Sequence, residues 1–330
     1  MRAVVMIEPA PGPDRTVIQD LPAPQPGSRK VTIEVAHAGV NFLDVMARRG
    51  DPGYASTWPY VPGLEVAGRI REIGSEVTGL SAGQRVAAFT RGGGFAELAV
   101  AEAASVVPLP DAVSTEIAAA APLMLTSALL LVTDVARVRE GDTVLMHSAS
   151  GGVGSAVAQL VPVFGGGLRI GTVGRVDKVP DAVSAGWDVV LPRTEATPEN
   201  VRDAAGGGID VVLDPLGTTM LDFDLDVAAP GARIALFGNP AGGAPAPLPP
   251  LGRLIRGNVA LAGFSISGLV ASAPHRAADA LRRALQLLAD GRLAPSITVL
   301  DGLDETPAAH QLLAEGHGVG KYVVAVSPSG

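Results

Sequence analysis

Alternating apolar and polar residues mark the first part of the chain as β-structure. Residues 31–35 read V-T-I-E-V, and short apolar stretches follow at 66–73, 85–89 and 95–100. Turns rich in Gly and Pro separate these stretches. Short, half-buried strands between frequent turns are typical of a compact, barrel-like β-domain, which we expect over roughly the first 110 residues.

The pattern changes after Ser114, where helical spacing begins and buried apolar stretches then alternate with helical segments. Helices separate the strands that we predict at 143–147, 168–173, 189–191, 209–214, 233–237 and 259–264. Such βαβ repeats form a parallel sheet with helices on its faces. The spacing also predicts a helix over 274–290 with Ser272 as its cap, and a strand–helix–strand tail within 296–326.

A glycine-rich turn follows the predicted strand 143–147 and opens a helix. Its sequence is S-A-S-G-G-V-G at 148–154, and Ala149 stands where the G-x-G-x-x-G pattern has its first glycine. Glycines let the backbone approach a pyrophosphate, and the N–H groups at a helix start attract anions. The turn therefore predicts a dinucleotide site formed by Ser150, Gly151, Gly152, Val153 and Gly154.

The end of the next strand indicates which dinucleotide binds. An Asp or Glu there bonds the ribose 2′-hydroxyl of NAD, and it would repel a 2′-phosphate. Here Gly174, Arg175 and Lys178 follow the strand, and the only acid, Asp177, lies beyond the strand end. Arginine suits bidentate phosphate binding. We therefore predict NADPH as the cofactor.

Short motifs spread along the chain carry a family resemblance. They are A-G-V-N-F-L-D (38–44), P-G-L-E-V-A-G (62–68), G-Q-R-V (83–86), the glycine turn, L-D-P-L-G (213–217), F-G-N (237–239) and G-K-Y-V-V (320–324). Together they resemble the zinc-independent medium-chain dehydrogenases/reductases of the NADPH:quinone oxidoreductase type. The resemblance implies an α/β fold with a GroES-like, β-rich catalytic domain over 1–120 and 270–330. It implies an inserted Rossmann domain, with a doubly wound parallel sheet, over 121–269.

The resemblance also implies site residues. Asn41 matches an amide that orients substrate, nicotinamide ribose or water, although a local Asx-turn is its alternative role. Asp44 is expected to hold the backbone or a neighbour rather than act as a base. Met46 replaces a tyrosine common in the family, which leaves Tyr54 and Tyr60 as the nearest candidate catalytic phenols. Further cofactor contacts are implied for Thr126, Arg193, Leu216, Phe237, Gly238, Asn239, Phe264, Ser265 and Lys321.

Residue types argue against a metal. The 330 residues include no Cys, and Asn41 and Leu64–Glu65 stand where zinc-dependent relatives have Cys and a His-Glu pair. None of the five histidines has metal-ligand spacing to another. We therefore assign no metal-binding role to His37, His147, His275, His310 and His317. Without a Lewis acid, alcohol oxidation lacks its usual means of lowering the hydroxyl pKa. We therefore predict metal-free hydride delivery from NADPH to a quinone or an α,β-unsaturated carbonyl.

Charge and hydropathy limit the partners. Lys+Arg 25 against Asp+Glu 33 gives a net charge of −8, which disfavours nucleic acid and anionic membranes. No stretch has the uncharged apolar length of a membrane helix, and the start shows no signal-peptide pattern. We expect a cytoplasmic enzyme with a small-molecule substrate. The apolar strand 259–264, at the edge of the predicted sheet, favours a homodimer.

Two other functions stay open at this point. The stretch G-V-N-F-L-D-V-M (39–46) resembles the reductase modules of polyketide synthases equally well. This alternative is a zinc-free enoyl-thioester reductase of a polyketide or fatty-acid pathway, and the lack of a Tyr proton donor at 45 or 46 counts against it. The second alternative is an NADPH-binding protein without catalysis, crystallin-like or a sensor.

Overall fold

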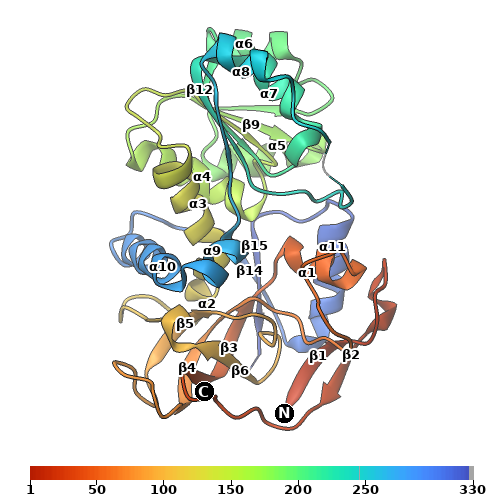
Figure 1. The fold of residues 1–330 in the computed structure, drawn as a ribbon, viewed down its shortest axis with the longest axis vertical. Helices are drawn as coiled ribbons and strands as arrows, with labels where there is room; N and C mark the ends of the chain where they lie inside the picture. Colours follow the sequence, from red (N-terminus) through yellow and green to blue (C-terminus); the bar gives the residue numbers. More distant parts are fainter. Residues whose placement is uncertain (245, 327–330) are drawn as a thin grey trace. The chain divides into compact units, whose positions relative to one another are not determined.

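The computed structural model describes residues 1–244 and 246–326, and it divides the chain into two units (Figure 1). Unit 1 comprises Met1–Thr126 and Ile266–Gly330, and unit 2 comprises Ser127–Ser265. The domain changes that we predicted, at 120/121 and 269/270, lie a few residues from these boundaries. Unit 2 is thus inserted between two segments of unit 1.

Unit 1 is built on a mostly antiparallel sheet. Its elements are β1 (Arg2–Met6), β2 (Thr16–Asp20), β3 (Lys30–Gly39), α1 (Phe42–Arg49), β4 (Glu65–Ile73), β5 (Arg85–Phe89), β6 (Leu98–Glu102), β7 (Val106–Pro108), α2 (Thr115–Ala118), α9 (Ile266–Ser272), α10 (Pro274–Ala289), β14 (Ile297–Leu300), α11 (Thr306–Ala314) and β15 (Lys321–Ala325). The main sheet has the order β14-β15-β3-β4-β5-β7, and β6 also pairs with β3. The last strand of the chain therefore lies beside β3.

The alternation in β3 packs the core of unit 1. Val31, Ile33 and Val35 are buried, whereas Glu34 is exposed. Strands β3 and β4 pair antiparallel, so the end of β3 lies beside the start of β4. Strand β15 pairs antiparallel with the same end of β3, through Val323 opposite Gly39. Three chain segments that are distant in sequence thus meet at one end of β3.

The helix predicted over 274–290 is confirmed as α10, but its cap is not Ser272. Ser272 is the last residue of α9, and its hydroxyl donates to the carbonyl oxygen of Gly268 at 2.7 Å. The N-cap of α10 is Ala273, whose side chain makes no capping bond. The prediction was wrong because the preceding segment is itself helical, and a hydroxyl inside a helix bonds a carbonyl of the preceding turn.

Unit 2 is a six-stranded parallel sheet with helices between its strands, as predicted. Its elements are α3 (Thr126–Leu130, beginning at the boundary), β8 (Val144–His147), α4 (Gly152–Val163), β9 (Arg169–Val173), α5 (Val179–Ala185), β10 (Val189–Pro192), α6 (Pro198–Ala205), β11 (Ile209–Asp214), α7 (Leu221–Val227), β12 (Ala228–Leu236), α8 (Leu251–Gly257) and β13 (Ala260–Gly263). The order is β10-β9-β8-β11-β12-β13. The strand order reverses between β8 and β11, and in such sheets ligands bind there, beyond the carboxyl ends of the strands.

No helix in the described part of the chain has the length and apolar character needed to cross a membrane.

Candidate functional site

The glycine turn connects β8 to α4 at the carboxyl edge of the unit 2 sheet. Helix α4 begins at Gly152, and its N-cap residue Gly151 has no side chain to bond the first N–H groups. The N–H groups of Gly152, Val153 and Gly154 therefore have no acceptor within the helix. A Cβ on Gly154 would lie 2.6 Å from the carbonyl oxygen of Ala149, so only glycine lets the helix start this close to the turn. The turn fits a dinucleotide pyrophosphate.

The turns after β11 and β12 lie against each other at the same edge. The N–H of Phe237 donates to the carbonyl oxygen of Asp214 at 2.9 Å, and the N–H of Leu216 donates to Asp214 Oδ1 at 2.6 Å. A Cβ on Gly238 would overlap the Pro215 carbonyl oxygen, so this close approach requires glycine. Other predicted cofactor residues lie at the same edge. Asn239 follows β12, and Phe264 and Ser265 follow β13.

Basic residues follow β9 and β10 at this edge. The guanidinium nitrogens of Arg193 lie 3.7 Å from the place of a Cβ on Gly174. The structure records no ion pair for Arg193 among the residues it describes, whereas Arg175 pairs with Asp177, with Nη2 2.9 Å from Oδ2. Lys178 is half-buried. Arg193 is thus the cation best placed to receive a phosphate, although the sequence pattern had pointed first to Arg175 and Lys178.

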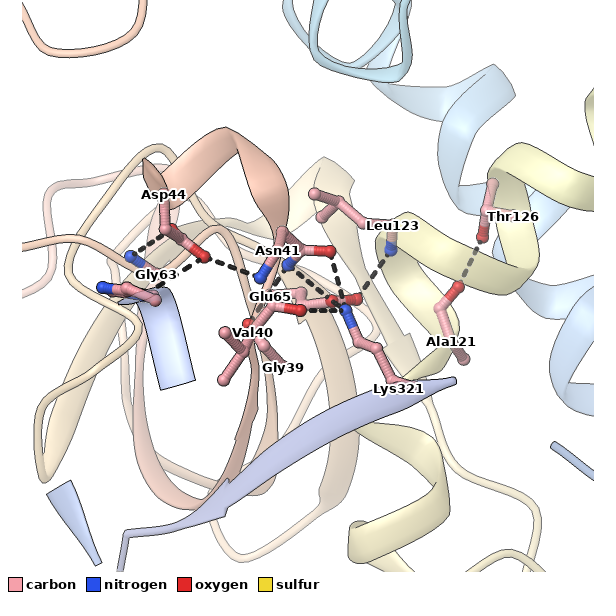
Figure 2. Close-up of polar contacts among 11 residues, drawn as sticks. Gly39, Val40, Asn41, Asp44, Gly63, Glu65, Ala121, Leu123, Thr126 and Lys321 are labelled. Atoms are coloured by element: carbon pink, nitrogen blue, oxygen red, sulfur yellow. Dashed lines mark hydrogen bonds and ion pairs between the residues drawn. The ribbon is translucent and has the colours of Figure 1, made fainter. Parts of the chain in front are cut away.

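A buried ion pair organises the polar residues of unit 1 (Figure 2). Glu65 begins β4, Lys321 begins β15, and their side chains are 0% and 4% exposed. Lys321 Nζ donates to Glu65 Oε1 at 2.5 Å, to Val40 O at 2.9 Å and to Asn41 Oδ1 at 2.7 Å. Glu65 Oε2 accepts the N–H of Leu123 at 2.7 Å. The three ammonium hydrogens are all donated inside unit 1, so the cofactor contact expected of Lys321 finds no spare donor.

Lys321 determines how the Asn41 amide is oriented. An ammonium can only donate, so the Asn41 atom that faces it is Oδ1. Nδ2 then donates to the carbonyl oxygen of Gly39 at 3.1 Å and to Glu65 Oε1 at 2.8 Å. Both amide hydrogens are used, and Asn41 is also the N-cap of α1, where its side chain forms a capping box with Asp44. The only group that Asn41 could still offer a ligand is the acceptor Oδ1, because its amide cannot donate without breaking this network.

Asp44 holds the backbone around Asn41. Its Oδ2 accepts the N–H of Asn41 at 2.8 Å, and its Oδ1 accepts the N–H of Gly63 at 3.2 Å. Burial raises the pKa of Asp44 to about 7, and the two N–H donors and the charge of Lys321 offset only part of that effect. The backbone role that we expected for Asp44 is therefore the one the structure shows.

The remaining predicted residues of unit 1 are Tyr54, Tyr60 and Thr126. The backbone of Tyr60 pairs with Met6, and burial, with a smaller effect of the Asp44 charge, raises the pKa of its phenol to about 12. Burial also raises the pKa of Tyr54. Thr126 is fully buried and its hydroxyl donates to the carbonyl oxygen of Ala121 at 3.0 Å. Both phenols stay protonated at neutral pH, whereas the Thr126 hydroxyl hydrogen is already donated.

Two groups of buried polar residues were not predicted. Glu65 had been noticed only as the substitute for a zinc-binding pair, and His147, Asp214 and Asp224 had been given no joint role. The available signal is an ionisable residue within an apolar strand, because a buried charge needs a partner. Spacing along the chain does not identify that partner.

The residues at the zinc positions do not fit a zinc ion. Position 41 is an amide, and the Glu65 carboxylate faces the Lys321 ammonium, which would repel a metal cation. Within residues 1–244 and 246–326, no three His, Cys, Asp or Glu side chains come together to hold a metal. Protein zinc sites use three or four such ligands. The donor set therefore argues against zinc at this position.

Known proteins are similar to this chain in both units. The alcohol dehydrogenase GroES-like domain matches residues 27–111, and the zinc-binding dehydrogenase family matches residues 185–324. The quinone oxidoreductase of Rattus norvegicus is 33% identical over 243 residues, which are 72% of this chain and 73% of that protein. Highly-reducing polyketide synthase 1 of Aureobasidium melanogenum is 31% identical over 318 residues, 93% of this chain but 14% of that protein.

One relative is much longer than the matched region. The synaptic vesicle membrane protein VAT-1 homolog-like of Homo sapiens is 33% identical over 221 residues, which are 66% of this chain. The match spans 51% of that protein, about half its length.

A solved structure covers almost the whole chain. A mycobacterial protein complexed with NADPH superimposes with a TM-score of 0.88 and 31% identity, over 98% of this chain and 99% of that one. Three findings indicate the same family. They are the match to rat quinone oxidoreductase, the matches to the two domain families and the glycine turn at the edge of the parallel sheet. The chain belongs to the medium-chain dehydrogenase/reductase family, in its quinone oxidoreductase branch.

Proposed function

We propose that this chain is a metal-free oxidoreductase that uses NADPH to reduce a quinone or an α,β-unsaturated carbonyl. One observation carries the proposal: the glycine turn and the basic residues lie at the same carboxyl edge of the unit 2 sheet. The N–H groups of 152–154 suit a pyrophosphate, and Arg193 with Lys178 suits a 2′-phosphate. The similarity to a mycobacterial NADPH complex supports the same cofactor.

In this proposal bound NADPH supplies the hydride, and the residues of the chain bind and orient. Asn41, held by Lys321 and Glu65, presents Oδ1 as an acceptor in a fixed orientation. It therefore accepts from a hydroxyl of the nicotinamide ribose, a water molecule or the reduced product. A fixed acceptor orients its partner without having to reorganise during the reaction.

Reduction of a quinone by hydride also consumes one proton, which ends on the product oxygen. Tyr54 and Tyr60 are our candidate donors of a hydrogen bond to that oxygen, because their raised pKa keeps each phenol protonated. Water is the candidate source of the proton itself. A carbonyl activated only by such donors must already be electron-poor, and this favours quinones and enones over simple ketones.

The polyketide synthase match supports a second candidate, an enoyl-thioester reductase. Such an enzyme must also protonate the α-carbon after hydride addition. Position 46, where a tyrosine would serve, is Met46, a buried residue of α1. An enoyl thioester is therefore the second substrate class to test.

The test is NADPH oxidation at 340 nm with matched sets of quinones, enones and enoyl thioesters. We expect turnover with quinones or enones and slower turnover with thioesters. NADPH binding without turnover of any class would support the non-catalytic alternative. The proposal fails if the chain binds no NADPH in a fluorescence titration.

We also propose that the protein is a homodimer joined along β13. This strand is at the edge of the unit 2 sheet, and Leu251 and Ile255 of α8 are 68% and 66% exposed. Helix α8 packs against β12, the neighbour of β13. An open apolar strand edge beside exposed apolar side chains favours pairing with a second copy of the same chain.

A further inference from the structure

A chain of buried hydrogen bonds links the carboxyl ends of three strands of unit 2. His147 ends β8, Thr172 lies near the end of β9, Asp214 ends β11 and Asp224 belongs to α7. All four residues are 0% exposed. His147 Nδ1 lies 2.8 Å from Thr172 Oγ1, and His147 Nε2 lies 2.9 Å from Asp224 Oδ1. Four polar side chains in an apolar interior need full mutual pairing.

The last link of this network is a pair of carboxyl groups. The carboxyl groups of Asp214 and Asp224 are both buried, and each influences the pKa of the other. Each has an Oδ2 atom that accepts from no N–H or O–H group in the described part of the chain. Two buried carboxylates that interact in this way cannot both ionise at low cost, so one proton is shared between them. His147 Nε2 faces the Asp224 carboxyl group, to which its N–H can donate, and Nδ1 faces the Thr172 hydroxyl.

Three of the four members, all but Asp224, also lie at a turn of the cofactor site. His147 directly precedes the glycine turn, and the carbonyl oxygen of Thr172 accepts the N–H of Ala149 at 3.0 Å. Asp214 Oδ1 accepts the N–H of Leu216 at 2.6 Å, and its carbonyl oxygen accepts the N–H of Phe237. The glycine turn and the turns after β11 and β12 are therefore tied together by this one network.

We propose that Asp224 is a positioning residue for the dinucleotide, which acts through His147 and Asp214 and through the proton that it shares with Asp214. The inference rests on the NADPH binding proposed above. Asp224 reaches neither the turns nor a cofactor directly. It fixes the imidazole and the carboxyl group from which the turns begin.

The shared proton makes cofactor affinity depend on pH. Burial, and then the charge of Asp224, raises the pKa of Asp214 to about 7, and burial raises the pKa of Asp224. The other charged or titratable groups that face the pair are His147 of β8 and Arg193 after β10. Below the pKa the pair carries one negative charge, and above it two. The second charge repels the cofactor phosphates and weakens the attraction of Arg193 for them.

Asp224→Asn separates this role from simple packing. The Asn oxygen still accepts from His147, and its NH₂ group can donate to Asp214. The variant removes the Asp224 charge, one of the two causes that raise the pKa of Asp214, so the ionisation of Asp214 moves to lower pH while its burial stays the same. Asp222→Asn is the matched control, since Asp222 lies on the same helix but is exposed and pairs with Arg253. Asp224→Leu removes the link to His147 altogether.

The experiment is a fluorescence titration of each protein with NADPH, measured without substrate at several pH values. We expect the Kd of the wild type and of Asp222→Asn to rise about threefold or more between about pH 6.5 and 8.5, relative to Asp224→Asn. The ionisation of the 2′-phosphate is common to all three and cancels in this comparison. Asp224→Leu should raise the Kd about tenfold, and in a separate NADPH-oxidation assay its kcat should fall less than about twofold.

The outcomes are distinguishable. If Asp224→Asn has the same pH dependence as the wild type, the inference is wrong while the proposed function stands. If Asp224→Leu binds NADPH like the wild type, Asp224 positions nothing. If Asp224→Leu does not fold, the pH dependence of the Kd in Asp224→Asn and Asp222→Asn still tests the inference. If the wild type binds no NADPH at any pH, the proposed function fails and this inference fails with it.

Discussion

Lys321 Nζ lies 2.5 Å from Glu65 Oε1, although 256 positions separate the two residues along the chain. Neither side chain has appreciable contact with water. Removing two charges from water costs several kcal/mol per ion, and their mutual attraction offsets this only when other hydrogen bonds complete the site. Here Val40, Asn41 and Leu123 supply those bonds. The pair therefore depends on both of its members.

Lys321→Met should lower the free energy of unfolding by about 3–5 kcal/mol, because it leaves the Glu65 carboxylate buried without a counter-charge. Combining it with Glu65→Leu should recover much of that loss. The control is Asp304→Ala, which removes an exposed ion pair with Arg2 and should cost less than about 1 kcal/mol. Urea unfolding measures all three. A loss in Lys321→Met no larger than the control would contradict the assignment.

Arg193→Ala should raise the KM for NADPH about tenfold and leave the KM for NADH nearly unchanged, since a charge-assisted phosphate contact contributes about 1.5–3 kcal/mol. Arg175→Ala should have a smaller effect, because Asp177 already occupies that guanidinium. Arg282→Ala, on the exposed side of α10, is the control. Initial rates with both coenzymes test this, and equal weakening of NADPH and NADH would exclude a 2′-phosphate contact.

Asp44 and His310 should give opposite dependences of stability on pH. Their side chains are buried 3.8 Å apart, and burial raises the pKa of Asp44 to about 7 and lowers that of His310 to about 3. Between about pH 4 and 6.5, Asp44 binds more protons in the folded protein than in the unfolded one. Its contribution to the free energy of unfolding therefore falls as pH rises. Folded His310 binds fewer protons than unfolded His310, so its contribution rises over the same range.

Each single variant should therefore reveal how the remaining residue makes the free energy of unfolding depend on pH. Asp44→Asn should make the free energy of unfolding rise with pH relative to the wild type, and His310→Leu should make it fall. The change should approach about 1.4 kcal/mol per pH unit in each case. Chemical unfolding at several pH values measures it, and the double variant should return to the slope of the wild type. If the free energy of unfolding changes with pH in the same direction in both single variants, relative to the wild type, the prediction of opposite dependences is wrong.

Turnover should be unaffected by EDTA or phenanthroline, because the residues at the zinc positions are Asn41 and a Glu65 already paired with Lys321. Metal analysis of the treated and untreated protein accompanies the assay. Stoichiometric zinc together with chelator-sensitive turnover would overturn the metal-free proposal.

Gly263→Pro should weaken the proposed dimer. The N–H of Phe264 donates to Leu236 of β12, and N–H groups alternate in direction along a strand, so that of Gly263 faces the open edge. Proline removes this donor and leaves the ladder to β12 intact. Ala262→Pro is a poor test, because the N–H of Ala262 faces β12. Sedimentation equilibrium at micromolar concentration measures the change, and a wild type that stays monomeric would rule out the dimer.

The cofactor edge of unit 2 could be predicted because its signals are local. A parallel sheet brings every strand's carboxyl end to one edge, so residues as distant as Gly154 and Phe264 can be assigned to it from strand periodicity alone. Their contacts with a dinucleotide stay a prediction. The sequence could not show which of Arg175, Lys178 and Arg193 is best placed for the 2′-phosphate. That depends on the ion pair that Asp177 forms with Arg175.

The buried polar networks depend on pairings that no spacing encodes. Glu65 meets Lys321 only because β15 returns to the end of β3, and His147 meets Asp224 only because α7 packs near the end of β8. Ser272 failed as a cap for a related reason, since α9 extends directly to it. Local pattern identified the strands and helices, whereas these contacts required the tertiary arrangement.

The enclosure of Lys321 has a practical consequence for chemical labelling. The chain contains three lysines, Lys30, Lys178 and Lys321. Amine-reactive dyes cannot reach an ammonium whose side chain is 4% exposed and whose hydrogens are all donated, so they should attach at Lys30 and Lys178, apart from the amino terminus. These two lysines lie in different units, which gives one reporter position in each. A dinucleotide bound beside Lys178 should protect that amine while Lys30 stays reactive, so mass spectrometry of the labelled peptides would report occupancy without any substrate.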